Sequence, residues 1–281
     1  MMKSTFEDFI KIEDLRNSET HSMDFMVQKV NEDPMNSKAP SRDDQTMLEV
    51  RHLYVGYYKD LNILQDLELT ARKSKISTIL GANGVGKSTL LKAVFGFLRP
   101  NAGEILLEGR SILGTPTYKR IQKGLAYIPQ QPGIFRDMSV EENLELGAWT
   151  FRRDKKRVRE KIAENYARFP ILGERRRQMT GELSGGQQRM VEIGRTLMSD
   201  PQMLLVDEPT AGLSKMLSEE VYQMLTDLRD REGLTILLVD QEIRKALKIS
   251  DYVYVLELGR NKYEGPAEEF TDVKKAFWVG G

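Results

Sequence analysis

A glycine-rich stretch constrains this chain more than any other feature. Residues 81–89 read Gly-Ala-Asn-Gly-Val-Gly-Lys-Ser-Thr and fit the phosphate-loop pattern G-x-x-x-x-G-K-[ST]. The apolar run at 76–80 predicts a short buried strand before the loop, and residues 90–95 predict the start of a helix after it. This order of strand, glycine loop and helix favours a binding site over a chance turn, and it predicts an α/β core.

The residue types in this stretch suit a triphosphate. Backbone amides of a glycine-rich turn can converge on phosphate oxygens because no Cβ blocks the approach. The helix that follows adds unpaired amides and the positive end of its dipole. In this pattern Lys87 reaches the β- and γ-phosphates, and the Ser88 hydroxyl binds Mg²⁺. The candidate nucleotide-binding residues of the loop are Gly81, Ala82, Asn83, Gly84, Val85, Gly86, Lys87, Ser88 and Thr89.

Composition excludes several other classes of protein. The chain has 42 basic and 42 acidic residues, and this neutral balance argues against a general nucleic-acid binder. It has no cysteine, which excludes disulfides and thiolate metal sites. No apolar run approaches the roughly 20 residues that span a bilayer, and the N-terminus is too acidic for a secretory signal. We therefore expect a cytoplasmic protein that, if it works at a membrane, docks onto a spanning partner.

Residues 1–46 differ from the rest in being polar and without a strand pattern. This composition predicts a flexible, passive extension, with the alternative of a partner-docking helix carrying Phe6, Phe9 and Ile10. The compact domain is expected to cover residues 47–281.

Alternating apolar residues at 47–55 and 63–69 predict an antiparallel β layer ahead of the core strand. Residues 103–109 predict another short strand, and residues 252–261 predict a hairpin that turns near Gly259.

Residues from about 138 to 182 change to a helical character. Ser139 with Glu142 forms a capping-box pattern, and the charged stretches 152–157 and 175–177 are expected to be helical. We interpret this region as a helical subdomain inserted into the core. Its basic clusters favour a solvated helix face, with contact to phosphate as the alternative.

The α/β pattern returns at residue 203. The unbroken apolar runs 203–206 and 235–239 are typical of strands buried on both faces in a parallel sheet. Asp207-Glu208 follows the first run and Asp240-Gln241 the second, at the strand ends where such sheets bind ligands. The strands at 76, 203 and 235 are therefore expected to end at one site.

The stretch Leu183-Ser184-Gly185-Gly186-Gln187 is a second strong signal. A serine and two glycines open a predicted helix, which gives another set of exposed amides suited to an anion. The alternative is a simple serine helix cap.

Taken in order, these motifs resemble the ATP-binding cassette (ABC) ATPase family over residues 48 to about 270. The resemblance rests on the phosphate loop, on Gln130 in Tyr-Ile-Pro-Gln-Gln, on the 183–187 signature and on residues 204–210, Leu-Leu-Val-Asp-Glu-Pro-Thr. It implies a P-loop NTPase core of α/β class with a mostly parallel sheet, an antiparallel β subdomain and an inserted α-helical subdomain.

The resemblance also implies roles for single residues. Asp207, with Ser88 and Gln130, would hold Mg²⁺. Glu208 would be the general base, assisted by Gln241. Tyr57 would stack on adenine, although plain strand packing is the alternative reading of that tyrosine.

In this family the signature contacts the ATP held by a second cassette. The resemblance therefore implies a dimer in which Ser184, Gly185, Gly186 and Gln187 face the partner's nucleotide. The partner is a second copy or a sister ATPase, and the pair acts on separate transmembrane permease subunits. No nucleic-acid partner is expected.

Two departures narrow the family. Gln241 stands where the family usually has histidine, and Ser214 stands where it usually has aspartate. Both are similar to the LivF-type branch that serves branched-chain amino acid importers, as is the tail Phe277–Gly281. Tyr58 and Lys73-Ser74-Lys75 depart from that branch and bear on the adenine side of the site.

The function that we expect is ATP hydrolysis on the cytoplasmic face of the membrane, powering uptake of branched-chain or other hydrophobic amino acids. Urea or short amides are alternative solutes. A non-transport ABC ATPase and a regulatory nucleotide-binding module without hydrolysis are alternatives of other classes. The chain has one cassette and no sustained heptad repeats, which counts against a non-transport ABC ATPase. Its intact Lys87 and Glu208 count against a regulatory module without hydrolysis.

Overall fold

The computed structural model describes residues 45–58 and 61–271, and the structural statements below concern those residues. Most of the predicted extension 1–46 and the whole of the tail 277–281 therefore lie outside the described part of the chain.

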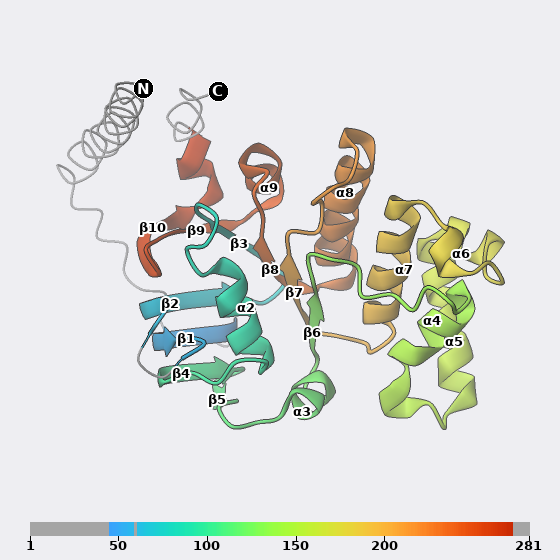
Figure 1. Cartoon of the computed structure of the whole chain (residues 1–281), viewed down its shortest axis with the longest axis horizontal. Helices are drawn as coiled ribbons and strands as arrows, with labels where there is room; N and C mark the ends of the chain where they lie inside the picture. Colours follow the sequence, from blue (N-terminus) through green and yellow to red (C-terminus); the bar gives the residue numbers. More distant parts are fainter. Residues whose placement is uncertain (1–44, 59–60, 272–281) are drawn as a thin grey trace, which may run out of the picture. The chain divides into compact units, whose positions relative to one another are not determined.

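Two β-sheets carry the domain (Figure 1). The larger sheet has the strand order β10-β9-β3-β8-β7-β6, in which β10 pairs antiparallel to β9 and every other pair is parallel. Its strands are β3 (Ile76–Leu80), β6 (Leu125–Ile128), β7 (Met203–Asp207), β8 (Thr235–Val239), β9 (Tyr252–Glu257) and β10 (Arg260–Pro266).

The smaller sheet is antiparallel, in the order β2-β1-β4-β5. Its strands are β1 (Thr46–Val55), β2 (Leu64–Arg72), β4 (Ala102–Leu107) and β5 (Arg110–Ser111). The predicted antiparallel layer, the short strand near 103 and the hairpin at Gly259 are therefore confirmed.

The parallel strands are buried on both faces, as their unbroken apolar runs predicted. In β7 the side chains of Met203 and Leu205 belong to one apolar core, and those of Leu204 and Val206 belong to another. The first core joins one face of the larger sheet to helix α2 (Lys87–Phe95) and to the antiparallel sheet. The second core joins the opposite face to helices α7 (Gly185–Leu197) and α8 (Lys215–Glu232) and to the helical region, residues 140–174.

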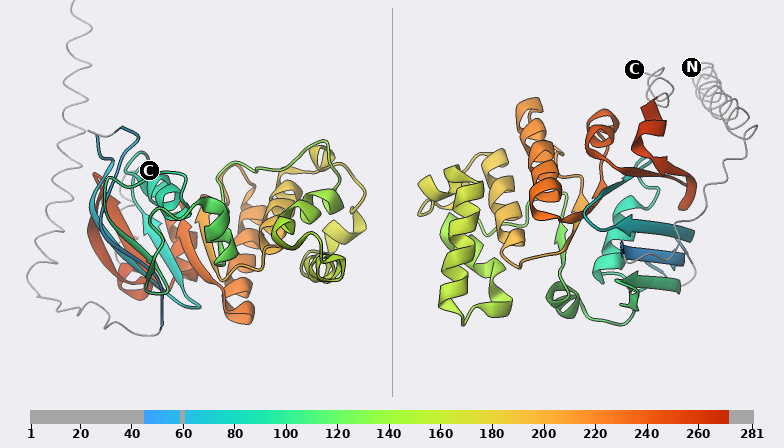
Figure 2. Two further views of the ribbon diagram at one scale, coloured as in Figure 1. Left: turned by 90° about the horizontal axis from the view of Figure 1, so that it is seen from below. Right: turned by 180° about the vertical axis from the view of Figure 1, so that it is seen from behind.

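The helices form two groups along the chain, and those of the helical region lie together at one end of the domain (Figure 2). The helices outside the helical region are α2 (Lys87–Phe95), α3 (Thr117–Gln122), α8 (Lys215–Glu232), α9 (Ile243–Ile249) and the 3₁₀ helix η3 (Ala267–Thr271). The helical region and its signature helix comprise α4 (Val140–Gly147), η1 (Trp149–Phe151), α5 (Lys155–Arg168), α6 (Pro170–Glu174), η2 (Thr180–Glu182) and α7 (Gly185–Leu197).

The helical region confirms one local prediction and corrects another. Ser139 caps α4 through the capping box with Glu142. Of the two charged stretches that we expected to be helical, 152–157 is helical only from Lys155, because Asp154 is the N-cap of α5, and 175–177 lies in a turn, because α6 ends at Glu174. Arginine is a good helix former, but tertiary contacts override propensity, and here the chain turns back so that the Gln178 carbonyl oxygen accepts from the Val140 amide.

Within the described residues, no helix is both long enough and apolar enough to cross a bilayer.

Candidate functional site

The phosphate-loop residues lie between β3 and α2, as predicted. The loop reaches this shape through glycines with positive φ, among them Gly81 at 150° and Gly84 at 84°. Gly86 is the N-cap of α2 and offers no side chain to the first-turn amides, and no acidic residue stands in that turn. The helix start therefore presents free donors suited to an anion.

Lys87 is folded onto its own loop. Its Nζ donates to the carbonyl oxygen of Gly81 at 2.7 Å and to that of Ala82 at 2.9 Å. Burial lowers the pKa of Lys87, although the carboxylates of Glu208, Asp207 and Asp240 oppose the effect. A buried cation so close to the free amides makes this end of the sheet attractive to phosphate.

Asp207 ends β7 beside this loop. The Ser88 hydroxyl donates to its Oδ1 at 2.9 Å, and the Tyr127 hydroxyl donates to its Oδ2 at 3.0 Å. Burial raises the pKa of Asp207, while the two hydroxyl donors act in the opposite direction. The structure thus brings Ser88 and Asp207 together, and it adds Tyr127, which our sequence reasoning missed.

The next residue, Glu208, is held by two amides. Gln130 and Gln241 each donate from Nε2 to its Oε2 at 2.6 Å. Glu208 also has a positive φ of 43°, which is costly for a residue with a Cβ. Three predicted residues from three separate segments therefore meet at one carboxylate.

A buried acid supports the segment that carries Gln241. Asp240 accepts from the backbone amides of Gln241 and Glu242 at 2.7 and 3.0 Å, and the Tyr222 hydroxyl donates to it at 2.9 Å. Burial raises the pKa of Asp240. Its position directly after a buried strand was a signal, but the partner Tyr222 on α8 was not visible in the sequence.

The signature residues lie apart from this cluster. Ser184 caps α7, accepting from the Gln187 amide at 3.3 Å, while the Gln187 side chain accepts from the Ser184 amide at 3.1 Å. Ser184 and Gly185 are exposed. Helix α7 packs on α4, α6 and β6, whereas the phosphate loop joins β3 to α2, so the two predicted anion sites do not meet within one chain (Figure 1).

The remaining predicted residues have simpler surroundings. Tyr57 is 53% exposed in the turn after β1, so its ring is open to a ligand, but no described contact assigns one. Ser214 caps α8 by accepting from the Leu217 amide at 3.4 Å. Ser214, which stands where the family usually has aspartate, therefore acts here as a helix cap, a position that either residue can fill.

The donor set suits Mg²⁺. Within the described residues, no three His, Cys, Asp or Glu side chains gather as a self-sufficient metal site. Asp207 and Ser88 instead offer one carboxylate and one hydroxyl, which matches the habit of Mg²⁺ of taking few protein ligands and completing its shell with phosphates and water.

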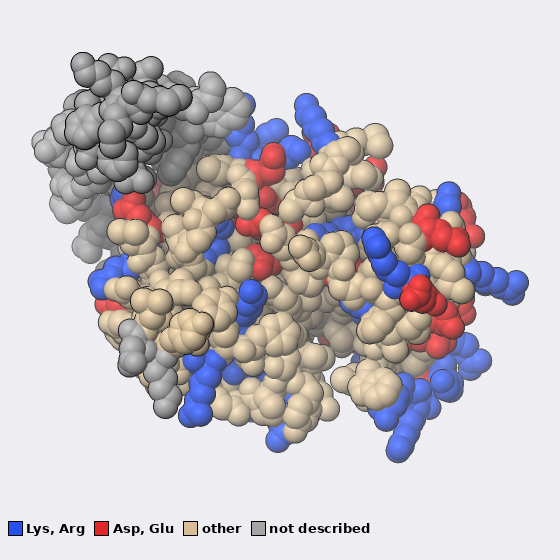
Figure 3. Space-filling view, in the orientation of Figure 1, with Lys and Arg blue, Asp and Glu red and all other residues tan. Residues whose placement is uncertain are grey.

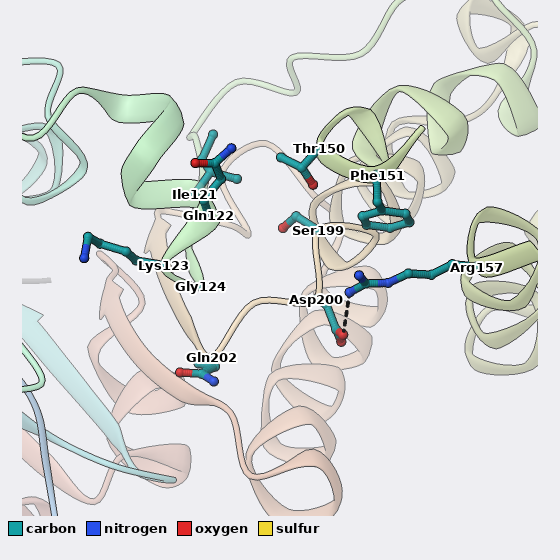
Figure 4. Close-up of a pocket in the computed structure, with 10 residues that line it drawn as sticks. All are labelled: Ile121, Gln122, Lys123, Gly124, Thr150, Phe151, Arg157, Ser199, Asp200 and Gln202. Atoms are coloured by element: carbon teal, nitrogen blue, oxygen red, sulfur yellow. Dashed lines mark hydrogen bonds and ion pairs between the residues drawn. The ribbon is translucent and has the colours of Figure 1, made fainter. Parts of the chain in front are cut away.

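A separate pocket of about 510 Å³ lies at the opposite ends of β6 and β7 (Figure 4). It is bounded by α3, η1, the start of α5 and the turn before β7, and Arg157 pairs with Asp200 across it at 3.4 Å. It contains none of the predicted nucleotide-binding residues.

On the face shown in Figure 3, acidic and basic side chains are interspersed, which agrees with the neutral net charge of the whole chain.

The family model described as ABC transporter matches residues 64–211. The LivF protein of Archaeoglobus fulgidus, described as a probable branched-chain amino acid transport ATP-binding protein, is 39% identical over 229 residues, which are 82% of this chain and 96% of that protein.

Two further relatives differ in their described roles. The Pseudomonas aeruginosa BraG protein, described as a high-affinity branched-chain amino acid transport ATP-binding protein, is 40% identical, covering 73% of this chain and 86% of BraG. The Haemophilus influenzae LptB protein, described as a lipopolysaccharide export system ATP-binding protein, is 35% identical, covering 75% and 88%.

Among solved structures, cbiO1 from Clostridium perfringens, described as part of an ABC transporter complex, superimposes with a TM-score of 0.76 at 28% identity. The match covers 82% of this chain and 92% of that one.

Proposed function

This chain belongs to the ABC transporter family, and on that premise we propose that it is the ATP-hydrolysing subunit of an importer for branched-chain or other hydrophobic amino acids. The observation that carries the proposal is the meeting of Gln130, Glu208 and Gln241 beside the phosphate loop. These are parts for hydrolysis as well as for binding, which favours an enzyme over a regulatory module that only binds nucleotide.

The phosphate loop binds the triphosphate. Its amides and those at the start of α2 donate to phosphate oxygens, and Lys87 adds a positive charge beside them. Tyr57 supplies an exposed ring for adenine. Asp207 and Ser88, with Gln130, would hold Mg²⁺, which supplies neutralising charge for the phosphates when it is bound.

Glu208 acts on the attacking water. Its carboxylate accepts the water's proton, and the amides of Gln130 and Gln241 fix the orientation of that carboxylate. Asp240 and Tyr222 hold the backbone of the segment that carries Gln241. No covalent enzyme intermediate is needed, because the chemistry rests on positioning and on neutralised charge.

A second cassette completes the site. Ser184 and Gly185 are exposed at the start of α7, and the four residues Ser184, Gly185, Gly186 and Gln187 would face the nucleotide of a partner. The partner is a second copy or a sister ATPase. The permease would dock at the cytoplasmic face of the membrane near residues 130–138, where the Phe135 ring is 53% exposed.

The solute class is supported by the descriptions of LivF and BraG. The resemblance to LptB supports a second candidate, an ATPase of lipid export. The two differ in the membrane partner, so purification of this chain with its native membrane subunits separates them.

The test uses that complex in proteoliposomes loaded with Mg-ATP. We expect phosphate release with uptake of labelled leucine, isoleucine or valine, and we expect Glu208→Gln in the same complex to abolish both. Phosphate release without amino acid uptake would contradict the solute class. Absence of phosphate release from the intact complex would contradict the enzyme itself.

A further inference from the structure

The signature helix α7 contains a fully buried ion pair that the proposed chemistry does not use. Arg189 and Glu192 stand one turn apart, and their side chains are both 1% exposed, with Nη1 of the arginine 2.6 Å from Oε2 of the glutamate. A buried pair of this kind seldom stabilises a fold more than apolar side chains would, because both charges lose their hydration. The pair therefore calls for another explanation.

Its partners give that explanation. The Arg189 guanidinium donates from Nη1 to the carbonyl oxygen of Pro129 at 2.7 Å and from Nη2 to that of Gln130 at 2.5 Å. The Glu192 Oε1 accepts from the Gly133 amide at 2.6 Å. The ion pair thus holds the backbone of the turn 129–133 by hydrogen bonds, and the Gln130 side chain of this turn donates to Glu208.

Arg195, one turn further along α7, closes the other side of this turn. Its Nη2 donates to the carbonyl oxygen of Gly133 at 2.7 Å, and its guanidinium lies 5.5 Å from the centre of the Phe135 ring. Both backbone groups of Gly133 are therefore bonded to α7 side chains, and the turn has little freedom to move relative to that helix.

The hydrogen bonding of the two charged side chains is incomplete. Burial raises the pKa of Glu192, with Arg189 and the Gly133 amide opposing it. The Nε of Arg189 is buried and has no hydrogen-bond partner. Unmet hydrogen bonding in a buried charged group is costly, so a role beyond stability is needed to account for the pair.

We propose that Arg189 and Glu192 are positioning residues that fasten the turn 129–133 to α7, so that the Gln130 amide and the Ser184 helix start move as one body. The inference rests on the proposed function, in which Gln130 holds Glu208 and Ser184 faces the partner's nucleotide. A shift of α7 as two cassettes close is then transmitted to the Glu208 carboxylate through backbone contacts that are already in place.

The test replaces both charges at once. The double variant Arg189→Met with Glu192→Met removes the pair without leaving a lone buried charge, so unfolding should occur at no lower denaturant concentration than in the parent. We expect ATP affinity within about twofold of the parent and a kcat lower by about tenfold or more in the assembled complex. Without the hydrogen bonds from Arg189 and Glu192 to the turn 129–133, hydrogen exchange of the Gly133 backbone amide should also be faster by about tenfold or more.

A matched control removes an ion pair between two other helices. Arg168 on α5 pairs with Glu232 at the end of α8 at 2.6 Å, and the double variant Arg168→Met with Glu232→Met should keep kcat within about twofold. Arg189→Lys serves if the first double variant does not fold. Lysine can pair with Glu192 but cannot reach both carbonyls with one fork, so kcat should fall while the unfolding transition stays in place.

Two results would overturn the proposal. One is a kcat that stays within about twofold in the folded double variant or, where that variant does not fold, in Arg189→Lys. The other is unchanged exchange of the Gly133 amide. Hydrogen exchange of the Gly133 amide is measured without nucleotide, so it tests the attachment of the turn to α7 even if the parent complex has no ATPase activity. Absence of ATPase activity would count against the proposed function alone.

Discussion

Two glycines of the phosphate loop should respond very differently to the same added methyl group. A Cβ at Gly81 would lie 2.5 Å from the backbone oxygen of Leu256 in β9 and 3.0 Å from a methyl carbon of Val85. A Cβ at Gly84 would meet nothing within 4 Å. Both positions have positive φ, so an alanine at either one would strain the backbone, but only an alanine at Gly81 would also contact neighbouring atoms.

The magnitudes follow from that difference. Gly84→Ala should lose about 1–2 kcal/mol of unfolding free energy, the usual cost of a left-handed residue with a Cβ. Gly81→Ala should lose about 2–6 kcal/mol, which combines about 1–3 for its sparsely populated backbone region with about 1–3 for overpacking. The obstacle is a carbonyl of the neighbouring strand, which cannot rotate aside as a side chain can.

The assay is urea unfolding of the purified chain without nucleotide or magnesium, followed by circular dichroism. Parent and both variants should share one slope, so that a shift in midpoint reports stability alone. We expect the Gly81 variant to lose about 2 kcal/mol more than the Gly84 variant. Equal losses, or a larger loss at Gly84, would refute the reasoning from contacts.

Three further predictions concern charge and catalysis. Glu208→Gln should retain ATP binding and stabilise the ATP-bound dimer, while turnover falls by about 10²–10⁴-fold through loss of the general base; normal phosphate release would remove Glu208 from that role. Because Gln241 does not titrate near neutrality, ATPase activity should show no inflection between about pH 6 and 7.5 that disappears in Gln241→Ala. The hydrogen bond that the His52 ring donates to the Asp66 carboxylate and the nearby charge of Glu68 raise the pKa of His52 above its ordinary 6.5. The stability that His52 adds over His52→Gln should therefore be fully present below pH 6.5 and decline as the pH rises through the raised pKa, and an NMR titration of the ring that gives a pKa of 6.5 or lower would contradict this.

The features that sequence predicted correctly are local. The capping box of Ser139 depends on two residues three positions apart, and the phosphate loop depends on nine consecutive residues. The parallel strands were visible because burial on both faces leaves a continuous apolar run. Their parallel pairing also follows the usual topology, so the fold class could be reached from pattern alone.

The features that sequence missed depend on contacts between segments far apart in the chain. Tyr127 reaches Asp207 across 80 positions of the chain only because β6 pairs directly with β7. Arg189 stands in a polar stretch that reads as a solvated helix face, yet α7 is covered by the turn that carries Gln130. Neither contact has a signal in composition or periodicity, since each is created by tertiary packing.

The backbone of Glu208 has a consequence for anyone who evolves this protein in the laboratory. Its left-handed conformation costs a glutamate about 1–2 kcal/mol, a cost that glycine largely escapes and asparagine partly escapes. A library scored only by the yield of soluble protein should therefore accept Glu208→Gly and Glu208→Asn readily, and it would enrich for well-expressed chains that have lost their carboxylate. Selection for activity has to be applied in the same round, since expression rewards the opposite choice at this position.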